Sequence, residues 1–272
     1  MEAHSFYLAS TPILVYHQVA SDTMLAHSAY IMPVSQFECQ MRYLHDSGYR
    51  CITLMEYLQS LSSGSFSQEK MFVLTFDDGY ENFLTVAYPV LRRYGFTATV
   101  FLVADYIGEL NCWDKGMKAP LLSRDQIREL RDAGISFGSH TSTHPHLPDL
   151  SSGQTRDELV RSKKRLEAAL DQEIPFLAYP YGESNSRIWK IASEAGYIGA
   201  CGVITGKSGR YNLWRRPCES TDSLLLFGFK LKIWYSWYLS LLRWAREDTF
   251  VGHHLRKFRK ERRFNEGIEP RI

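Results

Sequence analysis

The sequence predicts an α/β fold with a parallel sheet, because short apolar segments alternate with amphipathic segments along most of the chain. The short segments are rich in residues that favour strands and end at glycine or polar residues, which is typical of buried strands. The chain has 272 residues, 44% of them apolar, and therefore fits one domain with a sizeable core. Periodicity alone leaves open whether the sheet closes on itself.

Capping and helix-breaking residues mark several of the expected helices. We expect Ser35 to cap the first helix and Gly48 to end it. Ser123 and Gln126 form a predicted capping box, and Pro89 should interrupt or bend another helix. The expected strands are 12–16, 51–53, 71–74, 98–102, 135–139, 176–179, 198–201 and 213–217, and the helices after the first are 54–61, 80–94, 123–133, 155–170 and 186–195.

Two adjacent carboxylates, Asp77 and Asp78, follow the apolar run 71–74 within the sequence TFDDG. Burial of one charge is unfavourable by several kcal/mol unless the charge is paired, and two like charges also repel each other. A bound cation would remove this penalty. A solvated Asp-Gly turn would explain the same residues without a cation, so this stretch alone favours neither interpretation.

A second polar stretch, HTSTH, follows the predicted strand 135–139. Its histidines, His140 and His144, are four residues apart and can meet one metal ion from a single helical turn or a tight loop. With Asp78 they would supply two nitrogens and a carboxylate, a set typical of catalytic zinc, although spacing does not select the metal. Two surface histidines are the alternative interpretation.

These motifs resemble those of the polysaccharide deacetylases, carbohydrate esterase family 4, with the nodulation-type chitooligosaccharide deacetylase domain. TFDDG is similar to the first family motif, HTSTH to the second, and AYPYG at 178–182 to a common variant of the third. The resemblance covers roughly residues 12–217. It implies a distorted, incomplete (β/α) barrel with the active site at the C-terminal ends of the strands.

The resemblance also implies a reaction and a role for each motif residue. The expected enzyme is a hydrolase that removes N-acetyl groups from N-acetylated amino sugars in a polysaccharide or a lipid-linked saccharide. Its cofactor would be a divalent metal ion, with zinc as the first choice. Asp77 would act as the general base, and the backbone N–H of Tyr181 would help to hold the oxyanion. The metal ligands would be Asp78, His140 and His144.

The general acid of the family usually lies in a late Leu-x-x-His motif, but His253 and His254 lack the preceding leucine. The stretch Leu14-Val15-Tyr16-His17 fits this motif near the N-terminus. This order resembles the circularly permuted branch that includes poly-N-acetylglucosamine deacetylases. We therefore predict His17 as the general acid, and a histidine bonded within the core is the alternative.

The sequence departs from the family pattern in two places. Ala178 stands where the third motif usually has an arginine that orients the base, and the Asp-Trp group of the fourth motif has no convincing match. Arg215 or Arg216, on the strand that follows, could approach Asp77 in its place.

The predicted catalytic domain covers residues 1–222. The extension that follows it, 223–272, differs from that domain in composition. Residues 230–263 contain ten Lys and Arg against three acidic residues, and 233–242 is uncharged and rich in Trp and Tyr. Ten residues are too few for a bilayer span, which needs about 20. We expect the extension 223–272 to pack an aromatic helix on the barrel and to end in a solvated basic tail. A helix in the membrane interface, in contact through 230–263, is the alternative.

A net charge of +2 does not indicate a nucleic-acid partner, and only the basic tail would support one. The five cysteines are scattered with no close pair, which indicates reduced thiols. No signal peptide is visible at the start of the sequence. These features predict a cytoplasmic location, with peripheral membrane contact left open, and they leave the oligomeric state open.

Two further functions stay open as alternatives. A related amide hydrolase would act on a formyl group or on a small non-sugar amide. A catalytically silent carbohydrate-binding or assembly protein on the same fold should have lost the base or a metal ligand. The second alternative is less favoured, because the two motif carboxylates and both motif histidines are present.

Overall fold

The computed structural model describes residues 11–22, 30–63, 69–113, 118–203, 209–235 and 238. The chain divides into two compact units, Met1–Leu231 and Lys232–Ile272. All strands of the described residues belong to the first unit. Of the second unit, only 232–235 and 238 are described, so most of the predicted basic stretch 230–263 lies outside the described residues.

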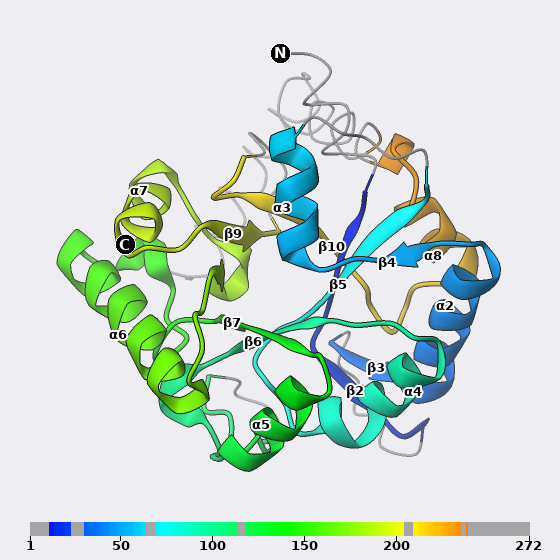
Figure 1. Cartoon of the computed structure of the whole chain (residues 1–272), viewed down its shortest axis with the longest axis horizontal. Coiled ribbons are helices and arrows are strands. Elements are labelled where there is room, and N and C mark those ends of the chain that lie inside the picture. Colours follow the sequence, from blue (N-terminus) through cyan, green and yellow to red (C-terminus); the bar gives the residue numbers. More distant parts are fainter. Residues whose placement is uncertain are drawn as a thin grey trace, which may run out of the picture. The chain divides into compact units, whose positions relative to one another are not determined.

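A closed ring of parallel strands forms the centre of the first unit (Figure 1). Strand β1 pairs with both β10 and β5, which closes the ring, so the described residues contain seven ring strands rather than the eight of a complete barrel. The expected α/β barrel is therefore confirmed. The ring strands are β1 (Ile13–Tyr16), β5 (Met71–Phe76), β6 (Thr99–Leu102), β7 (Ser136–Ser139), β8 (Phe176–Ala178), β9 (Gly199–Gly202) and β10 (Leu213–Pro217).

Three short strands lie outside the ring. Strand β4 (Arg50–Cys51) pairs with the first residues of β5. Strands β2 (Gln18–Ala20) and β3 (Ile31–Pro33) form a separate parallel pair that the sequence did not predict.

Alternate residues of the ring strands belong to two different apolar clusters. Ile13, Val73 and Leu213 lie in the smaller cluster, together with Leu58 of α3 (Leu54–Ser63). Their strand neighbours, such as Leu14 and Leu74, lie in the larger cluster with residues of the surrounding helices. The smaller cluster is therefore the barrel interior, because successive strand residues point to opposite faces. Figure 1 shows α3 in front of the strands and the other helices around them.

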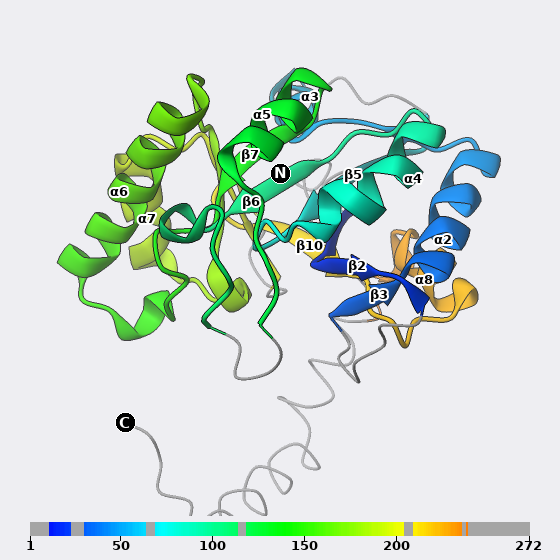
Figure 2. The same cartoon turned by 90° about the horizontal axis from the view of Figure 1, so that it is seen from below.

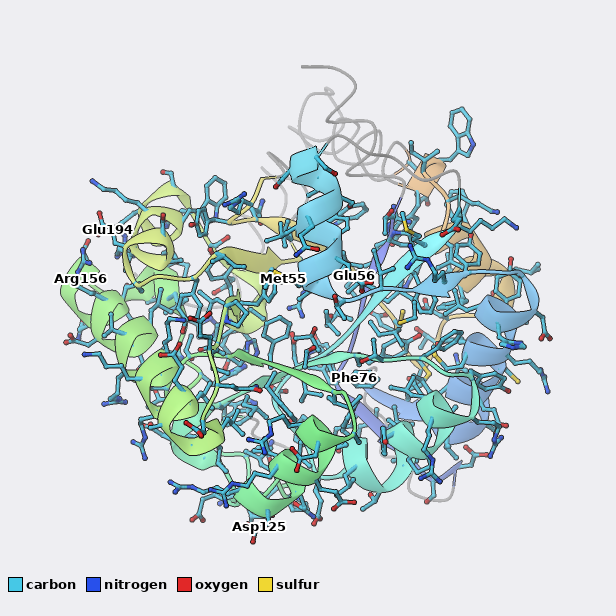
Figure 3. All side chains as sticks on the ribbon, viewed as in Figure 1. Met55, Glu56, Phe76, Asp125, Arg156 and Glu194 are labelled. Atoms are coloured by element: carbon cyan, nitrogen blue, oxygen red, sulfur yellow. The ribbon has the colours of Figure 1, made fainter. Side chains whose placement is uncertain are left out.

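The remaining helices cover the outside of the ring. The capping box of Ser123 and Gln126 is confirmed at the start of α5, and the helix expected through Pro89 is divided into a π-helical turn η2 (Phe83–Ala87) and α4. Arg156 of α6 pairs with Glu194 of α7 at 2.5 Å (Figure 3). The bounds are α2 (Val34–Asp46), α4 (Tyr88–Arg93), α5 (Arg124–Asp132), α6 (Ser152–Leu170), α7 (Ser186–Glu194) and α8 (Leu224–Lys230).

The predicted capping role of Ser35 is wrong. Helix α2 begins at Val34, so its N-cap position is Pro33, two residues before Ser35, and Pro33 makes no side-chain capping bond. The backbone N–H of Ser35 instead donates to the side chain of Asp22 at 3.2 Å. A residue from a distant part of the chain thus replaces the local cap.

Helix α8 lies on the same side of the barrel as α2 (Figure 2). Its Phe227 is buried and contacts the ring of Tyr43 edge to face, at 6.2 Å between centroids. The first residues of the predicted extension thus pack on the barrel. Among the described residues, no helix combines the length and the apolar character needed to cross a membrane.

Candidate active site

Asp78, His140 and His144 come together at the C-terminal ends of β5 and β7. The Nε2 atoms of His140 and His144 lie 3.5 Å and 3.3 Å from Oδ1 of Asp78. All three side chains are buried, and one potential ligand atom from each lies within 4.8 Å of the others. Oδ1 of Asp78 has no hydrogen-bond partner within the described part of the chain. A divalent cation fits this cluster, because it would satisfy the carboxylate and both imidazole nitrogens.

Tight turns with left-handed backbone aim these ligands. Asp78, Thr141 and His144 have φ values of 72°, 68° and 62°. Such values are unusual for residues other than glycine, and they persist only where the surroundings hold them. The HTSTH loop is held from α6, because the carboxylate of Glu158 accepts the backbone N–H groups of Ser142 at 2.9 Å and Thr143 at 3.0 Å. The two histidines therefore lie on a tight loop and not on one helical turn.

The surroundings of His140 suit a metal ligand. Its Nδ1–H donates to the carbonyl of Ala178 at 2.8 Å, which leaves Nε2 facing Asp78. Burial lowers the pKa of His140 to about 4, although the charge of Asp77 opposes the shift. His140 is therefore neutral near pH 7, as a metal ligand must be.

The second histidine, His144, lies between two aromatic rings. Trp113 stacks on it at 4.6 Å between centroids, and Tyr181 meets it edge to face at 4.7 Å. The neighbouring Asp114 lies outside the described residues.

Arg215 holds Asp77 in a two-pronged ion pair. Its two Nη atoms lie 2.6 Å and 2.7 Å from the carboxylate oxygens, and both side chains are buried. Burial alone would raise the pKa of Asp77, but the positive charge of Arg215 and its hydrogen bonds to the carboxylate outweigh burial and hold that pKa well below its ordinary value. Arg216 points elsewhere and donates to the carbonyl of Lys230. Of the two arginines left open by the sequence, the structure selects Arg215.

His17 directly follows β1, beside Asp77 in the sheet register. Tyr16 pairs with Phe76, and the N–H of Asp77 donates to the carbonyl of Tyr16 at 3.0 Å. The ring of His17 is half-buried and meets Tyr30 at 5.0 Å between centroids. The predicted general acid and base thus follow adjacent strands at the same end of the barrel.

Tyr181 lies in the tight turn η5 (Pro180–Gly182) after β8. Its φ of 58° is again left-handed, and the residue is 46% exposed. Gly182, at φ 69°, packs so closely on Val203 that an added Cβ would lie 2.7 Å from the Cβ of that side chain. Glycine is therefore required at the end of this turn.

Two residues at this site were missed by the sequence analysis. Glu158 gives no local signal, because a glutamate on a polar helix face is ordinary. His146 had a weak signal, since it lies only two residues after His144 in the same loop. Its ring stacks on that of Tyr181, with 3.8 Å between centroids and 7° between planes.

Comparisons with known proteins agree with this geometry. The model of the polysaccharide deacetylase family matches residues 65–200. YxkH of Bacillus subtilis, provisionally named a polysaccharide deacetylase, is 35% identical over 211 residues, which cover 76% of this chain and 71% of YxkH. The poly-beta-1,6-N-acetyl-D-glucosamine N-deacetylase of Staphylococcus aureus is 28% identical over 176 residues, which cover 61% of this chain and 59% of that enzyme.

A solved structure is also similar. The Streptococcus pyogenes deacetylase PplD, in complex with acetate, superposes with a TM-score of 0.69 and 28% identity, over 82% of this chain and 98% of PplD. The predicted resemblance to poly-N-acetylglucosamine deacetylases is confirmed. The chain belongs to the polysaccharide deacetylase family and is a hydrolase of carbon–nitrogen bonds other than peptide bonds.

Proposed function

We propose that the protein is a metal-dependent N-deacetylase that removes N-acetyl groups from amino sugars in a polysaccharide or a lipid-linked saccharide. One observation carries this proposal: a carboxylate held ionised by Arg215 lies beside the cluster of Asp78, His140 and His144. The named activity of the Staphylococcus aureus relative supports the choice of an N-acetylated sugar polymer as substrate.

A divalent cation, zinc in our proposal, would be held by Asp78, His140 and His144 and would supply Lewis acidity toward the acetyl carbonyl. Asp77 would accept the proton of the attacking water. Its lowered pKa keeps the base ionised at neutral pH, although it also weakens the base.

The proton for the departing amine would come from His17, which follows the strand next to that of Asp77. The backbone N–H of Tyr181 would donate to the oxyanion as the carbonyl carbon becomes tetrahedral. Base, acid and oxyanion donor would thus come from three different strand ends of one barrel face.

The experiment measures bound metal and acetate release from N-acetylglucosamine oligomers, after chelation and after reloading with zinc. The wild type should lose acetate release on chelation and regain it on reloading. Asp77→Asn and His17→Ala should keep bound metal and lose turnover by about 10²–10⁴-fold. Asp125→Asn, on the exposed surface of α5 (Figure 3), is the matched control and should behave as the wild type.

Other outcomes redirect the proposal. Bound metal without acetate release from any N-acetylated saccharide would move the substrate to a formyl group or a small non-sugar amide. Failure to bind metal under every loading condition would contradict the mechanism and favour a silent binding protein.

A further inference from the structure

We propose that His146 is a positioning residue for this reaction: with Glu183 it holds the turn that carries Tyr181. The inference rests on the proposed function of Tyr181 as the oxyanion donor. It assigns a task to a side chain that neither binds the metal nor transfers a proton in the mechanism above.

The turn needs something to hold it. Tyr181 and Gly182 are consecutive residues with φ of 58° and 69°. A left-handed tyrosine is strained, and such strain persists only where neighbouring groups fix the conformation. Inside the turn, the N–H of Gly182 donates to Tyr179 at 2.9 Å and that of Glu183 donates to Pro180 at 3.2 Å. These local bonds shape the turn but do not tie it to the rest of the site.

His146 supplies that tie from the neighbouring loop. Its ring lies flat on the ring of Tyr181, at 3.8 Å and 7°. Its Nδ1–H donates to the carboxylate of Glu183 at 2.8 Å. One imidazole therefore contacts the residues on both sides of Gly182 and links them across the turn.

The contacts of His146 connect the turn to the metal ligands. His146 follows His144 by two residues, and the ring of His144 itself meets Tyr181 edge to face at 4.7 Å. A shift of the Tyr181 ring would break the stack on His146, and a shift of the Glu183 side chain would break its bond from His146. These contacts would restrain the turn that carries the oxyanion donor relative to the metal cluster, and a misplacement of about 1 Å can reduce turnover about 10²-fold.

The chain offers a close control for surface contacts of the same kind. His45 of α2 also contacts a carboxylate, that of Asp46 at 3.0 Å, and also an aromatic ring, that of Tyr94 at 5.4 Å. The side chains of His45 and His146 are 57% and 50% exposed. His45 has no contact with the predicted catalytic residues, so His45→Ala removes comparable contacts away from the site.

The experiment compares the kcat and KM for acetate release, the bound metal and the amide hydrogen exchange of residues 179–183. His146→Ala should lower kcat about 10- to 100-fold, change KM less than about twofold and leave bound metal unchanged. His146→Phe keeps the stack, and His146→Asn keeps a donor for Glu183. Each should restore part of kcat.

Hydrogen exchange gives a readout that does not depend on the substrate. The amides of the turn should exchange faster in His146→Ala, whereas His45→Ala should match the wild type in exchange and in kcat. Glu183→Ala should lower kcat, and its addition to His146→Ala should lower kcat little further, because both act through one contact.

Two results would overturn the proposed positioning role of His146. Unchanged exchange at 179–183 in His146→Ala contradicts it, whatever the wild type hydrolyses. Faster exchange with a wild-type kcat shows a turn that is held but does not limit turnover, and the positioning role is then wrong. A wild type that binds metal but releases no acetate is a different failure, since it contradicts the proposed deacetylation.

Discussion

Two buried ion pairs lie in different parts of this protein, and they differ in how completely their polar atoms are paired. Asp222 and Lys230 anchor α8: the ammonium donates to both Asp222 oxygens, at 2.8 Å and 2.6 Å, and to the carbonyl of Pro217 at 2.7 Å. Three donors thus meet three acceptors. Asp77 and Arg215 lie at the ring centre, where Nε of Arg215 has no partner within the described residues.

The unpaired atoms near Asp77 and Arg215 gather in one place. Oδ1 of Asp78 and Nδ1 of His144 are also buried without a hydrogen-bond partner in the described part of the chain. Buried polar groups without partners are unfavourable and rare. The fully paired Asp222–Lys230 contact is therefore typical of a structural anchor, whereas the incompletely paired cluster is typical of a site that binds something further.

The largest expected effect is on kcat, which should fall when the Asp77–Arg215 pair is broken but not when the Asp222–Lys230 pair is broken. Asp77→Asn should lower kcat about 10²–10⁴-fold, because the base is lost. Asp222→Asn removes an equally buried carboxylate from the other pair and should leave the kcat of the folded protein within about twofold of the wild type. Acetate release, normalised to folded protein, measures both. Equal losses in the two variants would show that any broken buried pair abolishes activity.

A stability measurement should show the role of the Asp222–Lys230 pair. Lys230→Met leaves Asp222 buried without its cation and should lower the free energy of unfolding by about 3–5 kcal/mol. Urea unfolding measures this change. The double variant Asp222→Leu/Lys230→Met should recover much of the loss, since an apolar pair of similar volume is often tolerated. If Lys230→Met alone unfolds like the wild type, α8 is not anchored through this pair.

A conservative change at Arg215 should produce a smaller effect with a characteristic pH dependence. Lysine cannot make the two parallel bonds to Asp77, so Arg215→Lys should lower kcat about 10- to 100-fold. Burial then raises the pKa of Asp77, and because the carboxylate is the active form, the acid limb of kcat/KM should move to higher pH. A lower kcat with an unmoved acid limb would show that Arg215 does not act through the pKa of Asp77.

The smallest effect is expected at the edge of the same pair. The hydroxyl of Thr75 accepts from Arg215 at 3.3 Å and donates to the carbonyl of Leu14 at 2.8 Å. Thr75→Val removes both bonds at nearly constant volume and should lower the free energy of unfolding by about 1–3 kcal/mol, with kcat reduced only a few-fold. Urea unfolding and acetate release again give the two values. A loss of kcat as large as that of Arg215→Lys would make Thr75 part of the base-holding machinery.

The sequence predicted the site well where its residues directly follow strands. Asp77, Asp78 and His140 each continue an apolar run, and parallel strands bring such positions to one end of a barrel. The choice between Arg215 and Arg216 was also within reach, because Leu213 points into the barrel and the same alternation turns Arg215 inward.

Other features depend on contacts between distant parts of the chain and have no local signal. The start of α2 is set by Asp22, which accepts the N–H of Ser35. The HTSTH loop depends on Glu158 of a helix that looks ordinary in sequence. Helix α8 was not among the helices expected from the sequence, and it contains Gly228. Any side chain there would meet the hydroxyl of Tyr43, since an added Cβ would lie 3.0 Å from it.

The closure of the ring by β1 has a consequence for synthesis of the protein. Ile13 pairs with Val73 and also with Arg215, so one edge of the first ring strand stays unpaired until the last ring strand has been made. On the ribosome, Asp77 emerges 138 residues before the arginine that neutralises it. The nascent barrel thus carries two neighbouring carboxylates and unpaired strand edges until its final strand arrives, a state that favours slow folding and aggregation. We therefore expect chaperones to matter most for this chain just before β10 is translated.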